Sequence, residues 1–205
     1  MPTSSAESGR ALKTSSAPPQ AKILIAGGFG VGKTTLVGAV SEITPLSTEE
    51  QLTVASTGID NPGPAEGKTT TTVALDFGRI TLAAATLLLF GTPGQERFWF
   101  MWDDLLKGAI GAVVLVDTRR LDLSFAAVDF FERRGTPFVV AVNCFHGTQP
   151  YTADQIRTAL ELQDPQTAVL MVDARSKDSV RTVLLALLDR LISRAENTVT
   201  SEARR

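Results

Sequence analysis

A single glycine-rich segment, residues 27–34, restricts the possible folds of this chain more than any other feature. It reads G-G-F-G-V-G-K-T and matches the pattern G-x-x-x-x-G-K-[ST]. Residues 22–26 before it form a short apolar strand pattern, and residues 34–40 after it continue as a helix. In that context the glycines let backbone N–H groups curl around phosphate oxygens, and the helix start adds the positive end of its dipole. The segment therefore predicts a triphosphate site between the first strand and the first helix.

Two side chains of this segment are expected to act on the phosphates and on a metal ion. Lys33 can reach the β- and γ-phosphates and is a candidate catalytic residue, and the Thr34 hydroxyl can ligate Mg²⁺. The alternative is a glycine-rich turn with an ordinary surface lysine, which the flanking strand and helix disfavour. The predicted nucleotide contacts here are Gly28, Gly30, Val31, Gly32, Lys33, Thr34 and Thr35. The motif names neither the base nor the reaction.

Apolar runs and helical patterns alternate along the rest of the chain, which favours βαβ units and a mostly parallel sheet. The predicted strands are residues 22–26, 73–77, 82–90, 109–116, 137–142 and 168–172, and the predicted helices are 34–40, 96–107, 121–134, 152–162 and 179–194. The second and third strands are joined too tightly for a crossover, so they should form an antiparallel hairpin at one edge. The sequence thus predicts an α/β fold of the P-loop NTPase type. It should have a six-stranded, mostly parallel sheet, one antiparallel edge strand and helices on both faces.

The two ends of the chain have a different composition from the middle. Residues 1–20 are rich in Ser, Thr, Ala and Pro and have no hydrophobic periodicity, which is typical of a disordered tail. Residues 195–205 look similar and are expected to be a flexible tail. One folded domain is therefore predicted over residues 21–194.

Charge and cysteine content exclude several classes of function. Lys and Arg number 20 against 22 Asp and Glu, a net charge of −2, whereas proteins that bind nucleic acid through its phosphates are usually basic. One cysteine and one histidine exclude an internal disulfide and clustered Cys or His metal sites. Residues 1–20 have no apolar stretch, and the apolar run at 82–90 is too short to span a bilayer. We therefore expect a cytoplasmic protein that meets a membrane only through partners and binds no nucleic acid.

Two further segments carry a resemblance to a known family. Residues 72–77, T-V-A-L-D-F, resemble the switch I segment of Ras-like small GTPases, and residues 91–98, G-T-P-G-Q-E-R-F, resemble their switch II pattern D-T-A-G-Q-E-R-F. The resemblance covers about residues 21–194 and is strongest to bacterial Ras-like GTPases of actinobacterial operons that also encode roadblock-domain proteins and sensor kinases. It implies GTP or GDP as the bound nucleotide, Mg²⁺ as cofactor, and slow hydrolysis that controls partner binding.

The resemblance assigns roles within the two switch segments. Thr72 would contact Mg²⁺ and the γ-phosphate, although the run of threonines at 69–72 leaves its register open. Gly94 would offer its N–H to the γ-phosphate, and Gln95 would orient the attacking water. No arginine finger can be assigned, since Arg97 is expected to pair locally or pack, so a partner is a possible source.

One departure from the switch II pattern concerns the metal. Gly91 stands where the family has an Asp that holds a Mg²⁺-bound water. Weaker Mg²⁺ binding or slower hydrolysis follows unless Asp60, Asp76 or Glu96 substitutes, a choice that the sequence leaves open. On this interpretation, Gly91→Asp should tighten the Mg²⁺ dependence.

The base-recognition motifs are only partly present. Asn143 matches the first position of N-K-x-D, but Cys144 and His146 replace its Lys and Asp. A neutral imidazole offers one acceptor at best, so discrimination of guanine from adenine should weaken. His146 as an ordinary surface histidine is an equal alternative. By resemblance to S-A-K, the segment Asp173, Ala174 and Arg175 would hold the base, with the Ala174 N–H on the base and Arg175 as a wall.

Two readings of function follow. The first is a nucleotide-dependent switch whose segments 59–72 and 91–107 change order on hydrolysis, with roadblock-domain regulators, a GTPase-activating partner and a sensor kinase as the implied partners. The second is a non-hydrolysing nucleotide-binding scaffold. A small-molecule phosphotransferase ranks last because no Arg-rich lid insertion is present. The aromatic run 98–102 is either a partner surface beside switch II or part of the core.

Overall fold

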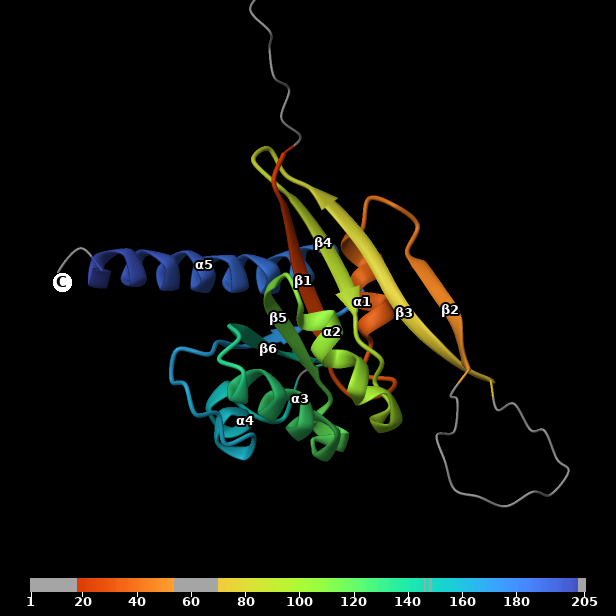
Figure 1. Ribbon diagram of the computed structural model, residues 1–205. Helices are drawn as coiled ribbons and strands as arrows, with labels where there is room; N and C mark the ends of the chain where they lie inside the picture. Colours follow the sequence, from red (N-terminus) through yellow and green to blue (C-terminus); the bar gives the residue numbers. More distant parts are fainter. Residues whose placement is uncertain (1–17, 54–69, 146, 148, 203–205) are drawn as a thin grey trace, which may run out of the picture.

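The computed structural model describes residues 18–53, 70–145, 147 and 149–202. Its centre is a seven-stranded sheet in the order β2-β3-β4-β1-β5-β6-β7 (Figure 1). The strands are β1 (Gln20–Ala26), β2 (Leu46–Thr53), β3 (Thr70–Thr81), β4 (Thr86–Gly91), β5 (Ala109–Val116), β6 (Phe138–Asn143) and β7 (Val169–Val172). The pairs from β4 through β1, β5 and β6 to β7 are parallel, and β3 is antiparallel to both of its neighbours.

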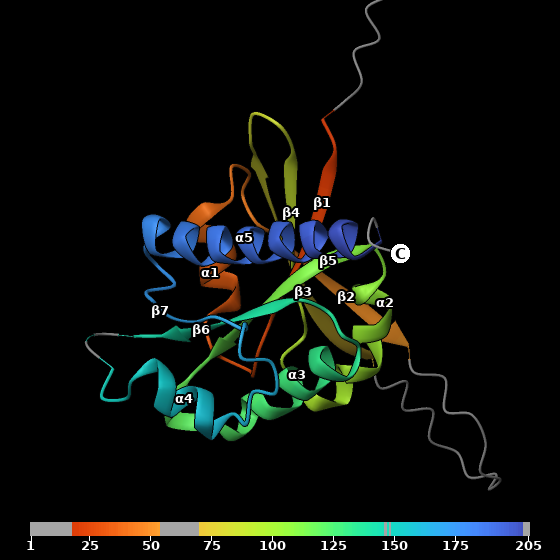
Figure 2. The same ribbon diagram turned by 90° about the vertical axis from the view of Figure 1, so that its left-hand side faces the viewer.

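Helices cover both faces of the sheet, as the continuous apolar strands require. The helical elements are α1 (Lys33–Val40), the 3₁₀ turn η1 (Glu96–Met101), α2 (Trp102–Leu106), the 3₁₀ turn η2 (Thr118–Arg120), α3 (Asp122–Arg133), α4 (Ala153–Ala159) and α5 (Lys177–Glu202). Helices α1 and α5 pack on one face, and α2, α3 and α4 on the other (Figure 2). Along β1, Ile23 and Ile25 belong to the first core and Leu24 and Ala26 to the second, which is the two-residue alternation of a strand.

The predicted fold class is confirmed: the sheet is mostly parallel with one antiparallel strand and helices on both sides. The structure adds a strand that the sequence did not reveal, β2, which pairs with β3. The antiparallel strand is therefore second from the edge and does not form it. The sequence of β2, L-S-T-E-E-Q-L-T, has two apolar residues, so its strand state depends on hydrogen bonds to β3 and not on an apolar pattern.

The hairpin between β3 and β4 also differs from the expectation. The predicted strands 73–77 and 82–90 leave residues 78–81 for the turn, whereas β3 continues to Thr81 and the chain turns at residues 82–85. There the N–H of Leu82 donates to the carbonyl of Ala85 at 2.8 Å and closes the turn. Leu82 is partly exposed and belongs to the turn rather than to the core.

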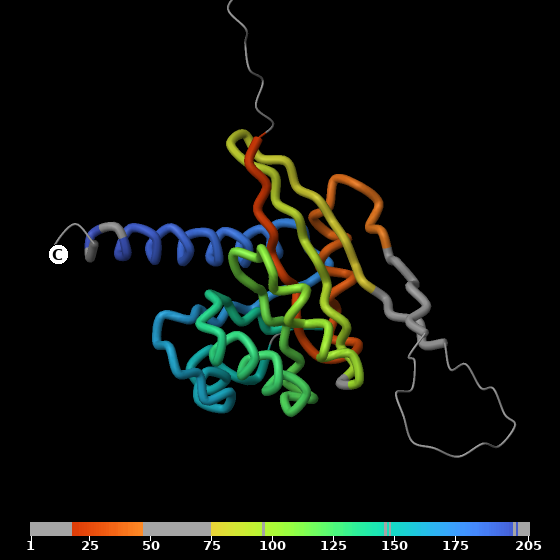
Figure 3. Tube along the Cα trace, viewed as in Figure 1, coloured from red at the N-terminus to blue at the C-terminus, as the bar shows by residue number. Residues whose placement is uncertain are grey.

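The last helix is longer than the apolar pattern indicated. It was expected to end at Arg194, but α5 continues to Glu202, through most of the segment predicted to be a flexible tail. No Gly or Pro interrupts residues 195–202, and the Thr198 and Thr200 hydroxyls donate to the carbonyls of Arg194 and Glu196. This end of α5 stands clear of the sheet (Figure 3). In the described ranges, no helix combines the length and apolar character needed to cross a membrane.

Candidate functional site

The glycine-rich segment lies where the parallel strands end and α1 begins. The N-cap of α1 is Gly32, with a φ of 107°, a left-handed conformation that glycine adopts without strain. Lys33 opens the helix, and its ammonium donates to the carbonyls of Gly27 at 2.9 Å and Gly28 at 2.8 Å. Strand, loop and helix thus have the arrangement that binds phosphate at a helix N-terminus.

Burial changes the charge state of this lysine. Removal from water lowers the pKa of Lys33 from 10.5 to about 8, and the nearby Asp76 carboxylate opposes that effect. The ammonium has two loop carbonyls as its hydrogen-bond partners. A triphosphate would offer it anionic oxygens instead, which form stronger bonds. The loop is therefore suited to an anionic ligand.

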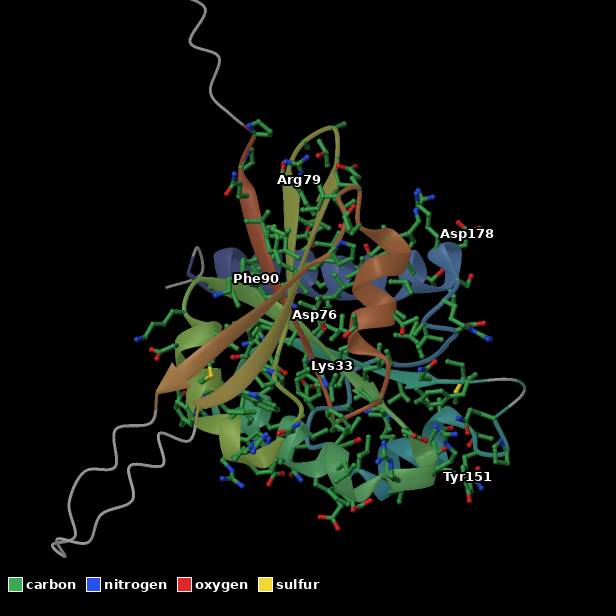
Figure 4. The ribbon with its side chains drawn as sticks, turned by 90° about the vertical axis from the view of Figure 1, so that its right-hand side faces the viewer. Lys33, Asp76, Arg79, Phe90, Tyr151 and Asp178 are labelled. Atoms are coloured by element: carbon green, nitrogen blue, oxygen red, sulfur yellow. The ribbon has the colours of Figure 1, made fainter. Side chains whose placement is uncertain are left out.

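The second feature of the site joins α1 to the antiparallel strand. The Thr34 hydroxyl donates to Oδ2 of Asp76 in β3 at 2.6 Å. Asp76 is buried and pairs in the sheet with Gly91, the last residue of β4. Figure 4 shows Lys33 and Asp76 close together near the middle of the molecule. A carboxylate from β3 thus reaches the candidate metal-binding hydroxyl.

Gly91 is necessary for this arrangement. A Cβ atom at position 91 would lie 2.9 Å from Cβ of Asp76 and 3.0 Å from its Oδ2. The Asp76 side chain therefore fills the space beside the strand end where the Ras-like pattern has an Asp. Of the three substitutes considered from the sequence, Asp60 lies outside the described residues and the Glu96 side chain is not described. Asp76 is the one that contacts Thr34.

The oxygen atoms gathered here fit a magnesium ion bound with a nucleotide. Mg²⁺ prefers oxygen ligands and takes one or two from the protein, the rest coming from phosphates and water. Thr34 and Asp76 supply such atoms, and Oγ1 of the buried Thr92 has no hydrogen-bond partner among the described residues. Within the same part of the chain, no three His, Cys, Asp or Glu side chains form a metal cage. Thr72 lies in β3 opposite Gln51, but its side chain is outside the description, so its role as a metal ligand stays a prediction.

Switch II lies directly on the phosphate loop. A Cβ on Gly94 would be 2.7 Å from the Lys33 ammonium and 2.8 Å from both the Gly28 carbonyl carbon and the Phe29 nitrogen. Only glycine permits that approach. The structure thus places Gly94 against the phosphate loop, and its contact with a γ-phosphate stays a prediction. Gln95 follows at the start of η1 with its side chain partly exposed.

The predicted base-recognition residues come together around a cavity of about 180 Å³. Asn143 organises it: its Nδ2 donates to the Val31 carbonyl at 2.9 Å, and its Oδ1 accepts from the Ala174 N–H at 3.3 Å. The cavity is lined by Gly30, Gly32, Thr35, Asn143, Phe145, Asp173, Ala174 and Arg175. Three segments far apart in the sequence therefore form one pocket beside the phosphate loop. His146 lies outside the described residues.

Phe145 is the lining residue that sequence reasoning missed. The Arg119 guanidinium lies 4.0 Å from the centroid of its ring, and Asp117 holds that guanidinium with bonds of 2.8 Å to each carboxylate oxygen. Phe145 also lines a second cavity of about 390 Å³, on the side of Arg119. An aromatic residue two positions after Asn143 was the available signal. Arg175, the expected wall, is paired with Asp173 at 2.9 Å.

The aromatic run 98–102 was expected to be either core or exposed surface, and its side chains are of both kinds. Phe98 and Trp102 are buried, whereas Phe100 is 65% exposed and Trp99 36% exposed. Trp102 packs edge-on against Phe130, and its Nε1 donates to the Pro93 carbonyl at 3.2 Å. The buried indole thus connects switch II to α3, while two aromatic side chains face solvent.

Comparisons with known proteins place this geometry in context. The model of a family described as "Conserved hypothetical ATP binding protein" matches residues 25–194. The chain is 37% identical over 101 residues to the uncharacterized protein MJ1339 of Methanocaldococcus jannaschii. The aligned stretch covers 49% of this chain and 53% of that relative. It therefore spans about half the length of the curated relative that it matches.

Solved structures resemble the fold at low sequence identity. The G domain of the T. maritima FeoB iron transporter aligns with a TM-score of 0.57 and 16% identity, covering 83% of this chain and 98% of that one. The cytosolic domain of the same transporter in a GDP form aligns with a TM-score of 0.61 and 15% identity. That alignment covers 86% of this chain and 65% of the cytosolic domain. The FeoB G-domain of Methanococcus jannaschii aligns with a TM-score of 0.54 and 14% identity. That alignment covers 82% of this chain and 98% of the G-domain. At such identities the likeness shows the fold alone, which this chain shares with those G domains.

Proposed function

Because the chain belongs to the family described as conserved hypothetical ATP binding protein, we propose that it is a nucleotide-dependent switch. It binds GTP with Mg²⁺, hydrolyses it slowly and changes its partner surface on hydrolysis. The observation that carries the proposal is the hydrogen bond from Thr34 to Asp76 beside the Lys33 ammonium. A hydroxyl, a carboxylate and an ammonium at the start of α1 are the groups that a magnesium triphosphate requires.

The residues around the phosphates have separate tasks. Backbone amides of residues 28–34 and the Lys33 ammonium bind the β- and γ-phosphates. Thr34 and Asp76 would hold Mg²⁺, which when bound draws negative charge from those phosphates. Thr72 is proposed to join them from switch I. Gln95 orients the attacking water, a role that needs a neutral donor and acceptor.

The switch follows from the position of Gly94. Its backbone lies on the phosphate loop at Gly28 and Phe29, so a bound γ-phosphate must displace it or become its hydrogen-bond acceptor. The same segment leads through Pro93 and η1 to the exposed Trp99 and Phe100. Loss of the γ-phosphate would therefore be transmitted to two exposed aromatic side chains, which are typical anchors of a partner surface.

We propose GTP as the preferred nucleotide, with weak selectivity over ATP. Phe145 offers its ring face to the base, and an aromatic face stacks on every base. The Ala174 N–H and Asn143 are proposed to supply the polar contacts, as in the Ras-like pattern, once the base replaces their hydrogen bond to each other. The cytosolic FeoB domain has a GDP form, whereas the family is described as ATP-binding, so both purines need testing.

The partners are proposed by resemblance alone. Roadblock-domain regulators, a GTPase-activating partner and a sensor kinase complex would bind on switch II, in the cytoplasm, with membrane contact only through those partners and no nucleic acid involved. Trp99→Ala should then abolish partner binding with little loss of thermal stability.

The alternative function is a nucleotide-binding scaffold that does not hydrolyse. Two sequence features favour it, the missing carboxylate at Gly91 and the incomplete base-recognition motif. The contact between Asp76 and Thr34 weakens the first and leaves the second. Single-turnover phosphate release separates the two. Hydrolysis by the wild type that Gln95→Leu abolishes supports the switch, and no release from either protein supports the scaffold.

Calorimetry of the purified full chain tests the binding step. GTP, GDP and ATP are each titrated with and without Mg²⁺, first into the wild type and then into Lys33→Ala. Lys107→Ala is the matched control, because Lys107 is an exposed lysine paired with Asp104 at 2.7 Å. Magnesium-dependent binding that only Lys33→Ala loses supports the proposal. Equal heats for all three proteins would contradict it.

A further inference from the structure

The side chain of Arg120 reaches the phosphate loop from the turn after β5, the strand that pairs with β1. Arg120 is the last residue of η2, the short turn that follows β5. Its Nη2 donates to the carbonyl of Phe29 at 2.8 Å, across 91 positions of sequence. A Cβ on Gly30 would lie 3.4 Å from the same nitrogen. An exposed guanidinium thus lies beside the phosphate loop, outside the set of residues proposed to bind the nucleotide and Mg²⁺.

The backbone of Arg120 is held firmly in that place. Its N–H donates to the carbonyl of Asp117 at 3.0 Å, and the buried Asp117 carboxylate accepts from the N–H of Arg119 at 3.0 Å. Only rotations of the Arg120 side chain are therefore needed to aim the guanidinium. That group carries five N–H donors in a planar fork, which matches phosphate oxygens.

Phe29 connects Arg120 to the expected position of the γ-phosphate. The Phe29 nitrogen lies 2.8 Å from where a Cβ of Gly94 would stand, and its carbonyl oxygen accepts from Arg120. Gly94 and Arg120 therefore approach the loop at the two ends of one residue, which spans less than 4 Å. A γ-phosphate that meets the Gly94 N–H would lie within a side-chain rotation of the Arg120 guanidinium.

Two other arginines of the described ranges lie near these segments, and each has its contacts elsewhere. Arg97, which follows Gln95, has its guanidinium 4.8 Å from the centroid of the Phe98 ring. Arg119 is bound by both oxygens of Asp117. Among the described residues, Lys33 and Arg120 are thus the cations whose polar atoms touch the phosphate loop itself.

The geometry points to Arg120 as an arginine built into the chain that stabilises the transition state of triphosphate hydrolysis. In this step the oxygen of water bonds to the γ-phosphorus, and the bond from that phosphorus to the β–γ bridging oxygen breaks. The bridging oxygen leaves on the diphosphate with the bonding electrons, and the protons of water pass to inorganic phosphate and solvent. Arg120 shifts from the Phe29 carbonyl to the bridging and γ-oxygens, where negative charge grows. The inference rests on the proposed function, which it extends by a catalytic residue.

Single-turnover hydrolysis of Mg²⁺·GTP by the full chain tests this inference, with wild type, Arg120→Ala and Arg120→Lys. Arg133→Ala is the control, because Arg133 is an exposed arginine of α3 paired with Asp129. Arg120→Ala should lower the rate constant at saturation about 30-fold, the ratio between related switches with and without an arginine in cis. GTP and GDP affinities should stay within about threefold, and Arg120→Lys should recover part of the rate. Arg133→Ala should match the wild type.

A second readout uses GDP with aluminium fluoride, which mimics the transferring phosphoryl group. Wild type and Arg133→Ala should form this complex without any partner, detected by tryptophan fluorescence, and Arg120→Ala should not. An unchanged rate in Arg120→Ala, or weaker GTP and GDP binding with an unchanged rate at saturation, would overturn the inference and make Arg120 a loop support. A wild type that binds GTP without hydrolysing it overturns the inference but leaves the binding site. A wild type with no nucleotide affinity overturns the proposed function itself.

Discussion

Asp76 and Gly91 show how a site can keep a chemical group while the residue that supplies it changes. The Ras-like switch II pattern has an Asp at the position that ends β4, and this chain has glycine there. Asp76, its neighbour across the hairpin, directs a carboxylate to Thr34 through the space above Gly91. Each substitution makes sense only with the other, because the two side chains would occupy the same volume.

The pair gives a prediction that replaces the one made from sequence. Gly91→Asp should not tighten Mg²⁺ dependence; it should cost about 1–3 kcal/mol of folding free energy, because its Cβ collides with Asp76. Asp76→Gly should weaken Mg²⁺-dependent GTP binding. The double variant Asp76→Gly, Gly91→Asp should recover stability and part of the Mg²⁺ dependence. Urea unfolding and Mg²⁺ titration check this, and a stable Gly91→Asp protein with tighter Mg²⁺ dependence would contradict it.

Lys33 gives a prediction about pH. Burial within the protein lowers its pKa to about 8, and bound phosphates would raise it by stabilising the ammonium. Above pH 8, nucleotide binding must therefore be accompanied by uptake of one proton. The affinity for triphosphate should then decrease by up to tenfold for each further pH unit. Below pH 8 the lysine is already protonated and this dependence should disappear. Calorimetry in buffers of different ionisation enthalpy measures the proton uptake. Lys33→Arg, which stays charged, should lose the dependence, and a flat wild-type profile from pH 7 to 9.5 would refute the account.

At the scale of elements, switch II has a buried anchor and an exposed pair. Trp102 lies against Phe130 and bonds to Pro93, so its packing positions the segment that carries Gly94 and Gln95. The polar strand β2 shows the opposite case. An edge strand without an apolar face is stabilised by its neighbour's hydrogen bonds, which no local pattern reveals.

The two tryptophans should respond differently to truncation. Trp102→Ala removes a side chain that is 2% exposed and should cost about 3–5 kcal/mol, whereas Trp99→Ala, at 36% exposure, should cost under about 1 kcal/mol. Thermal and urea unfolding of both variants check the difference. Equal losses would mean that Trp99 is as much a part of the core as Trp102.

Across the whole molecule, the last turns of α5 contribute little to the fold. Residues 193–198 are exposed, whereas Leu187 earlier in the helix is fully buried. A chain ending at Arg194 should keep its melting temperature within about 2 °C, because no buried apolar area is lost. A chain ending at Leu184 should fail to fold cooperatively. A large destabilisation of the chain that ends at Arg194 would show that the end of α5 packs on another surface.

The local features of this protein were decided by its sequence. The phosphate loop, the apolar strands and the helical pattern of residues 179–194 each follow from residues a few positions apart. Backbone geometry and side-chain period act over such short distances. The contacts that complete the site were decided by tertiary structure. Thr34 meets Asp76, Phe29 meets Arg120 and Val31 meets Asn143 across 42, 91 and 112 positions. Such pairs depend on which strands lie side by side and in what register, and only the packed sheet determines that order.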